Sequence, residues 1–289
     1  MGLLEKLMKP MIEKTAEATA KHIGELSENL NSEVNKVGEI VGQSPDSYNS
    51  QIFNLAKQIN KDIVIPIAVI VITFIAIYSL VNLVIDKNNL HDIDTFIFFK
   101  WIFITYISIW FVTHSFDLVM AIFSICQKMI AGVTNVGVAS TDISSQLDSI
   151  KESLKELNIL ELGYLYGTVR LYSITSKLIG ILTWIVALGR MIEIYFTIAV
   201  SSLPLATMTS NRYSNVGDGY IKQVIALGLQ GLFMIMAVAT YSVLIQGISY
   251  DSLTAGDVAL IPLNILGYGF LLLIVLFRTK SIARSIVGI

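Results

Sequence analysis

The apolar run from residue 178 to residue 208 constrains this chain most. It is longer than the about 20 residues that cross a bilayer, yet it contains two charged residues, Arg190 and Glu193. A charge at the bilayer centre costs roughly 2.5 to 3.5 kcal/mol. Residues three apart share one face of a helix, where opposite charges can neutralise each other. Because such groups persist only against protein or a water-filled cavity, we predict a membrane helix that borders a polar interior.

The composition agrees with several membrane spans. Hydrophobic residues make up 54% of the chain and charged residues 15%, with a mean hydropathy of +0.68, whereas soluble domains carry about 25% charged residues. We therefore expect an all-α polytopic membrane protein with about five transmembrane helices and two amphipathic extramembrane helical segments. The expected spans cover residues 63–85, 96–125, 172–208, 220–248 and 259–277.

These spans divide the chain into four regions. We expect residues 1–60 to be an extracytoplasmic amphipathic helical region, 61–125 the first transmembrane pair, 126–172 an extramembrane helical loop, and 173–289 a transmembrane core of three spans with a cytoplasmic basic tail. Apolar residues recur every three or four positions from Ile23 to Val41 and from Ile143 to Leu157, which is typical of amphipathic helices. Each stripe can pack on the rest of the protein or on lipid, or it can bind a partner helix.

Basic residues near the membrane predict the orientation. The tail after residue 277 carries Arg278, Lys280 and Arg284, which favours a cytoplasmic C-terminus and therefore, with five spans, an external N-terminus. Basic residues beside the first two spans argue the other way. Charges interrupt every apolar segment of the first 25 residues, so we expect no signal peptide there.

The candidate functional residues lie in and just after the first run. Arg190, Glu193 and Thr197 share a helix face, which Ser201 continues if the helix persists, and Ser202 follows. We expect a break at Pro204, because proline kinks or ends a helix. One interpretation is a buried ion pair that fixes packing or subunit register, and the other is the polar lining of a translocation path or subunit interface.

Two further features of the spans are candidates. His114 and Asp117 are three residues apart near the end of the second span, either as an interfacial polar step or as a buried functional pair. Gly228 and Gly231 in the fourth span allow close approach of a neighbouring helix.

The sequence contains none of the common motifs for catalysis, nucleotide binding or metal binding that we considered. There is no P-loop, HExxH, CxxC or GxSxG pattern, and the only cysteine is Cys126. We therefore expect a protein that is not an enzyme and that uses no cofactor or metal. The net charge of -2 provides no overall basic field for nucleic acid, so any such contact has to be local or mediated by a partner.

Residues 190–207 read RMIEIYFTIAVSSLPLAT. This stretch resembles the Arg-then-Glu, small-residue, Pro-Leu-Ala segment of the TrbL-type family, a polytopic inner-membrane subunit of bacterial type IV secretion and conjugation systems. The layout of the expected spans is also similar. The short length and the Lys, Asn and Ile usage resemble the compact form of Gram-positive conjugative elements. Residue by residue, the resemblance extends to Arg190, Glu193 and Pro204.

The resemblance implies a channel or scaffold subunit of the bacterial cell membrane that helps to move a single-stranded DNA–protein complex. The implied partners are further copies of the chain, other secretion subunits including ATPases, membrane lipid, and, transiently, single-stranded DNA with its relaxase. The alternative is a small-molecule or ion transporter. A transporter predicts inverted repeats with matching broken helices, whereas the only break we expect is near Pro204.

Overall fold

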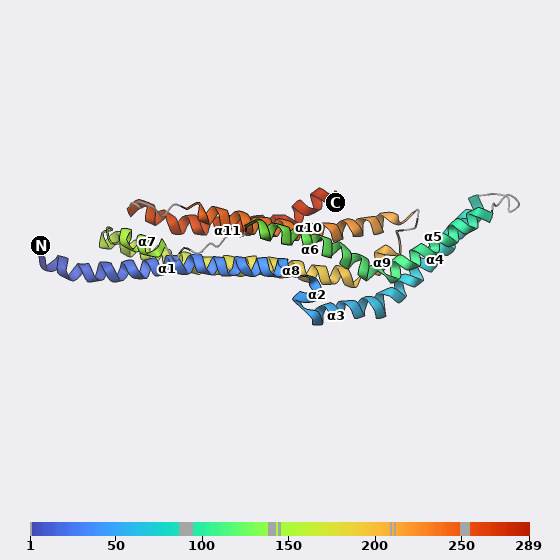
Figure 1. The fold of residues 1–289 in the computed structure, drawn as a ribbon, viewed down its shortest axis with the longest axis horizontal. Coiled ribbons are helices and arrows are strands. Elements are labelled where there is room, and N and C mark those ends of the chain that lie inside the picture. The colour runs from blue at the N-terminus through green and yellow to red at the C-terminus, as the bar shows by residue number, and fades with distance from the viewer. Residues whose placement is uncertain are drawn as a thin grey trace. The chain divides into compact units, whose positions relative to one another are not determined.

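The computed structural model describes residues 2–86, 95–137, 143, 146–208, 210, 212–248 and 255–289. Helices make up nearly all of this part of the chain, which has no strand, so the predicted all-α polytopic class is confirmed. Figure 1 shows these helices in chain order. They are α1 (Gly2–Gly42), α2 (Pro45–Tyr48), α3 (Ser50–Ile59), the π-helix η1 (Asn60–Val64), α4 (Ile65–Asp86), α5 (Thr95–Thr113), α6 (Ser115–Gly137), α7 (Leu147–Leu154), α8 (Ile159–Ala199), α9 (Ser202–Leu205), α10 (Ser214–Gln246) and α11 (Ala255–Val287).

Six helical stretches of the described residues are long and apolar enough to cross a membrane, where the sequence suggested about five. The difference arises in the expected second span, residues 96–125. The structure divides this stretch between two helices, α5 and α6, and α6 continues beyond residue 125 to Gly137. A helix over residues 96–137 would be roughly 63 Å long, about twice the hydrocarbon thickness. The two helices meet at His114, whose backbone N–H still donates to the carbonyl of Trp110 at 3.0 Å.

The chain divides into two compact units, which we describe separately. Unit 1 contains residues 1–41, 131–188 and 233–279. The apolar stripe predicted between Ile23 and Val41 is buried in it. Gly180 of α8 marks a close approach of α1, because a Cβ added there would lie 2.6 Å from the Cγ of Glu33. Within this unit the stripe therefore packs on the chain's own helices.

The second predicted stripe is partly buried. Ile150 and Leu154 of α7 are buried, and Lys151 pairs with Glu17 of α1 at 3.5 Å. Residues 138–142 and 144–145 of the expected loop lie outside the described residues. Helix α8 begins at Ile159, inside the stretch expected to be extramembrane, so one continuous helix contains the end of that stretch and the third span.

Unit 2 contains residues 42–130, 189–232 and 280–289. The predicted break is present, because α8 ends at Ala199 and the four-residue helix α9 contains Pro204. In this unit α4 and α5 pack together, and the indole N–H of Trp101 donates to the carbonyl of Ala76 at 3.1 Å. All of the predicted site residues lie in this unit, where the end of α8 contacts α10 and the last residues of α11.

Candidate functional site

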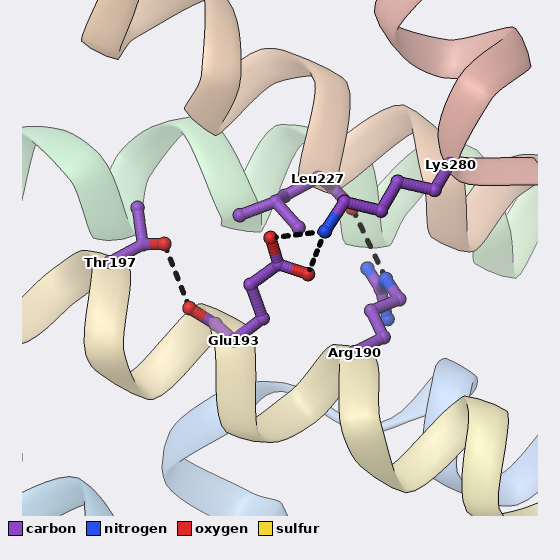
Figure 2. A network of polar contacts seen from close by, with 5 residues as sticks. All are labelled: Arg190, Glu193, Thr197, Leu227 and Lys280. Atoms are coloured by element: carbon purple, nitrogen blue, oxygen red, sulfur yellow. Dashed lines mark hydrogen bonds and ion pairs between the residues drawn. The ribbon is translucent and has the colours of Figure 1, made fainter.

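Arg190 is a buried cation on α8 that points into α10. Only 4% of the residue is exposed, and its Nε donates a hydrogen bond to the carbonyl of Leu227 at 3.1 Å (Figure 2). No ion pair joins its guanidinium to a carboxylate within the described part of the chain. The prediction that Arg190 is sheltered from solvent is consistent with this burial, but its charge is not neutralised as we expected.

Glu193 pairs with a different residue. Its carboxylate accepts from Nζ of Lys280 on α11, at 2.7 Å and 2.9 Å for the two oxygens (Figure 2). The expected Arg190–Glu193 pair is therefore corrected to Glu193–Lys280. The physical reason is that helix spacing brings two residues to one face but does not exclude a longer-range partner. The two side chains of the observed pair are 30% and 45% exposed, so this pair borders the surface of the unit.

Glycines of α10 make room for Arg190. A Cβ added at Gly231 would lie 2.6 Å from Cζ of Arg190, and one added at Gly228 would lie 3.0 Å from Cβ of Cys126 on α6. Ordinary carbon contacts are about 3.5 to 4.0 Å. The close approach predicted from these glycines is therefore observed, and it is what admits both a guanidinium and a thiol against the backbone of α10.

Thr197 continues the polar face of α8 by one turn. Its hydroxyl donates to the carbonyl of Glu193 at 2.7 Å, and its own carbonyl accepts from the hydroxyl of Tyr220 on α10 at 2.7 Å. The residue is buried. Thr197 thus joins α8 to α10 through its own backbone carbonyl, and its hydroxyl bonds within α8.

Ser201 and Ser202 belong to a separate cluster, because α8 ends before them. The cluster also contains Asn60 of η1 and Ser115 at the start of α6, and all four side chains are buried. Ser115 and Ser202 share a hydrogen bond at 2.6 Å, and Ser201 donates to Ser115 at 3.2 Å. Asn60 donates to Ser201 at 3.1 Å and accepts from Ser202 at 3.2 Å. These bonds form a closed ring of buried polar groups.

Asn60 and Ser115 were not predicted from the sequence. The Nδ2 of Asn60 also donates to the carbonyl of Ala199 at 3.0 Å, and so satisfies one of the carbonyls that every helix end leaves without an intrahelical partner. Asn60 begins the π-helix η1, and π-bulges are frequent at functional sites. A polar residue just before a long apolar run is the signal that could have identified it.

The remaining predicted residues do not join either cluster. Pro204 lies in α9, where its carbonyl accepts from the hydroxyl of Thr207 at 2.7 Å. The ring of His114 stacks on that of Trp110, with centroids 4.7 Å apart. No hydrogen bond or ion pair joins His114 to Asp117 in the described structure, so the buried functional pair we considered is not formed.

The chemistry of this site is that of charge and hydrogen bonding. Glu193 and Lys280 line a small cleft with Arg284 and with Gln230, whose buried Oε1 has no hydrogen-bond partner among the residues that the structure describes. The cleft has a volume of about 10 Å³, the space of about one water molecule. No group of three or more potential metal ligands occurs among the residues the structure describes. Two cations, Lys280 and Arg284, and the single carboxylate of Glu193 leave the lining of this cleft with one net positive charge.

Comparisons with known proteins give one finding. The model of a family described as TrbL/VirB6 plasmid conjugal transfer like protein matches residues 30–202, more than half of the chain. The matched range includes Arg190, Glu193 and the serine cluster. No curated protein and no solved structure matches significantly.

Proposed function

Because the chain belongs to the TrbL/VirB6 plasmid conjugal transfer family, we propose that it is a channel or scaffold subunit that helps to move a single-stranded DNA–protein complex across the cytoplasmic membrane. Membership makes it a conjugal transfer or type IV secretion component, in a family of structural subunits of the transfer system. Its apolar helices make it a multi-pass membrane protein. These facts favour a transfer subunit over a small-molecule or ion transporter.

The observation that carries the proposal is the polar junction of α8, α10 and α11. Arg190 is buried, so it anchors α8 to α10 and presents no charge to a path. Glu193 and Lys280 are partly exposed, so they are the charged groups that can meet a passing substrate or a neighbouring subunit. A polar group between membrane helices persists where it faces protein or water. A subunit interface provides protein contacts, and a translocation path provides water.

The proposed partners and orientation follow from the same role. Cytoplasmic ATPases would meet the C-terminal tail, where Arg278, Lys280 and Arg284 favour the cytoplasmic side. Five spans place the N-terminus outside, as the sequence predicts, whereas six crossings would place it on the same side as the C-terminus. The other partners are further copies of the chain, other secretion subunits, membrane lipid, and transiently the single-stranded DNA and its relaxase.

A conjugation assay tests this proposal. The donor strain lacks its own copy of the gene and expresses the Glu193→Ala variant instead. This variant should lower the transfer frequency at least tenfold while the membrane level of the protein stays normal. We expect the membrane level to stay normal because a partly exposed ion pair contributes only about 0 to 1 kcal/mol to stability. Glu193→Ala leaves Lys280, and not Arg190, without its carboxylate.

The matched control is Glu39→Ala, which removes an exposed carboxylate from α1 that makes no ion pair in the described structure. Transfer by this strain should equal that of the wild type. If Glu193→Ala also transfers normally, the polar junction has no part in transport and the proposal loses its structural support.

A further inference from the structure

A groove lies between α4 and α5 in unit 2. The two helices pack on each other, and the groove between them has a volume of about 260 Å³. Most of the residues that line it are apolar, and its polar lining includes Ser79, Lys100 and Thr105. The indole of Trp101 also lines it and is held by its hydrogen bond to the carbonyl of Ala76. We call this hollow the α4–α5 groove.

The groove opens where lipid surrounds the protein. Both α4 and α5 lie in stretches that are long and apolar enough to cross a membrane, and their outward faces carry large apolar side chains. Phe74 is 73% exposed, Phe99 66% and Phe103 63%. A large exposed apolar surface marks contact with a membrane or with another protein. On two membrane helices, the acyl chains of lipids provide that contact.

Three polar groups of the groove have no partner in the described part of the chain. Lys100 is the only charged residue of the lining, and no carboxylate pairs with it there. The hydroxyls of Ser79 and Thr105 likewise make no hydrogen bond to a described residue, whereas that of Thr73 donates to the carbonyl of Val69 at 2.8 Å. A charge or a donor among membrane helices is costly without an acceptor. The groove therefore lacks an acceptor for one cation and two hydroxyls.

The polar part of the groove lies at the level of a membrane surface. Arg212 belongs to the exposed segment between α9 and α10, and its guanidinium donates to the hydroxyl of Tyr78 on α4 at 3.1 Å. Basic side chains in connections between membrane helices lie at the level of the lipid head groups. Ser79 follows Tyr78 in the chain, and the hydrogen bond of Trp101 to α4 brings Lys100 to the same stretch of the helix pair. Ser79 and Lys100 are thus level with the phosphates of the lipids.

We propose that the α4–α5 groove binds one anionic phospholipid. The lipid phosphate accepts from Lys100 and from the hydroxyl of Ser79, and a glycerol ester carbonyl accepts from Thr105, further along α5. The first carbons of an acyl chain then lie on the apolar wall. A head group with a net negative charge is selected because a zwitterionic lipid carries its own cation beside the phosphate, and that cation competes with Lys100.

The size and lining of the groove favour a lipid over two other occupants. Its volume equals that of about nine water molecules, so it admits the phosphate and part of one chain while the rest of the lipid stays in the bilayer. Inorganic phosphate would pair with Lys100 but leave the apolar wall uncovered. A helix of another protein is about 10 to 12 Å across, so only one of its side chains would enter a hollow of this volume.

Native mass spectrometry of the detergent-purified full chain tests the site. Phosphatidylglycerol and phosphatidylcholine with identical acyl chains are added at equal concentrations. The protein should retain one phosphatidylglycerol at about fivefold higher occupancy than phosphatidylcholine, because a basic residue near a membrane surface contributes about 1 kcal/mol toward an anionic lipid.

The variants separate the charge from the groove. Lys100→Gln should abolish the preference for phosphatidylglycerol, and Lys100→Arg should keep it. Ser79→Leu fills the groove and should lower the retention of both lipids. Lys177→Gln is the matched control, because it removes an exposed lysine of the membrane helix α8 that also has no ion pair in the described structure, and it should keep the preference.

Four results would overturn the proposal. Equal occupancy of the two lipids in the unaltered protein excludes selection by charge. Equal loss of preference in Lys100→Gln and Lys177→Gln excludes this groove as its source. Release of the bound lipid by inorganic phosphate indicates a site for a free anion, and an acidic protein that is lost with Lys100→Gln while lipid retention is unchanged indicates a protein partner. The transfer test of Glu193 is independent of all four, because the lipid site does not rest on the proposed function.

Discussion

Gly231→Ala should destabilise the protein through Arg190. The added Cβ would lie 2.6 Å from Cζ of Arg190 and 2.9 Å from Cδ1 of Ile130, so α10 is pushed outward and the guanidinium also loses its hydrogen bond to the carbonyl of Leu227. Overpacking costs about 1 to 3 kcal/mol. Loss of a hydrogen bond from a charged group adds about 1.5 to 3 kcal/mol. The better helix propensity of alanine returns about 1 kcal/mol, which leaves a net loss of roughly 1.5 to 5 kcal/mol.

Thermal unfolding of the detergent-purified protein measures this loss. At about 2 to 4 °C per kcal/mol, Tm should fall by roughly 3 to 20 °C. Gly219→Ala in the same helix is the matched control, because a Cβ built there has no atom of another described segment within 4 Å. It should keep or slightly raise Tm through helix propensity alone. If both alanine variants unfold at the same temperature, Arg190 does not pack against the backbone of α10 and our account of the site is refuted.

Four other substitutions test the hydrogen bonds and packing of unit 2. Asn60→Ala leaves buried groups of the serine cluster unsatisfied and should cost about 1 to 3 kcal/mol, measured by the same thermal unfolding; an unchanged Tm would contradict the closed ring. Tyr195→Phe removes the hydroxyl that donates to the carbonyl of Pro45 at 2.7 Å and should cost about 1 kcal/mol, with no change expected if that bond is absent. Gly228→Ala should lower Tm and Cys126→Ala should restore part of it, because the added Cβ meets the side chain of Cys126; additive effects of the two changes would exclude that contact.

The features that depend on local sequence could be predicted. Continuous apolar runs determine that the helices are membrane spans, and the fold class follows from them. The break between α8 and α9 near Pro204 follows from proline chemistry. The close approach at Gly228 and Gly231 follows from the absence of a Cβ. In each case a few neighbouring residues decide the outcome.

The features that depend on distant residues could not be predicted. Glu193 and Lys280 are separated by 87 positions, and helix periodicity does not indicate which helix supplies the partner of a charge. Arg190, the nearest cation in the sequence, is directed instead into the space that Gly231 leaves open. Asn60 and Ser115 are single polar residues of kinds that are common at helix ends, and only the packed structure shows that they complete a ring with Ser201 and Ser202.

Exchange of the two charges of the Glu193–Lys280 pair tests the central claim most directly. Glu193→Lys and Lys280→Glu should each lower conjugative transfer, because each places two like charges within the 2.7 Å contact that now joins opposite ones. The double variant restores the attraction and should recover most of the transfer frequency at an unchanged membrane level. A double variant that transfers no better than the worse single variant would contradict a site in which this ion pair joins α8 to α11.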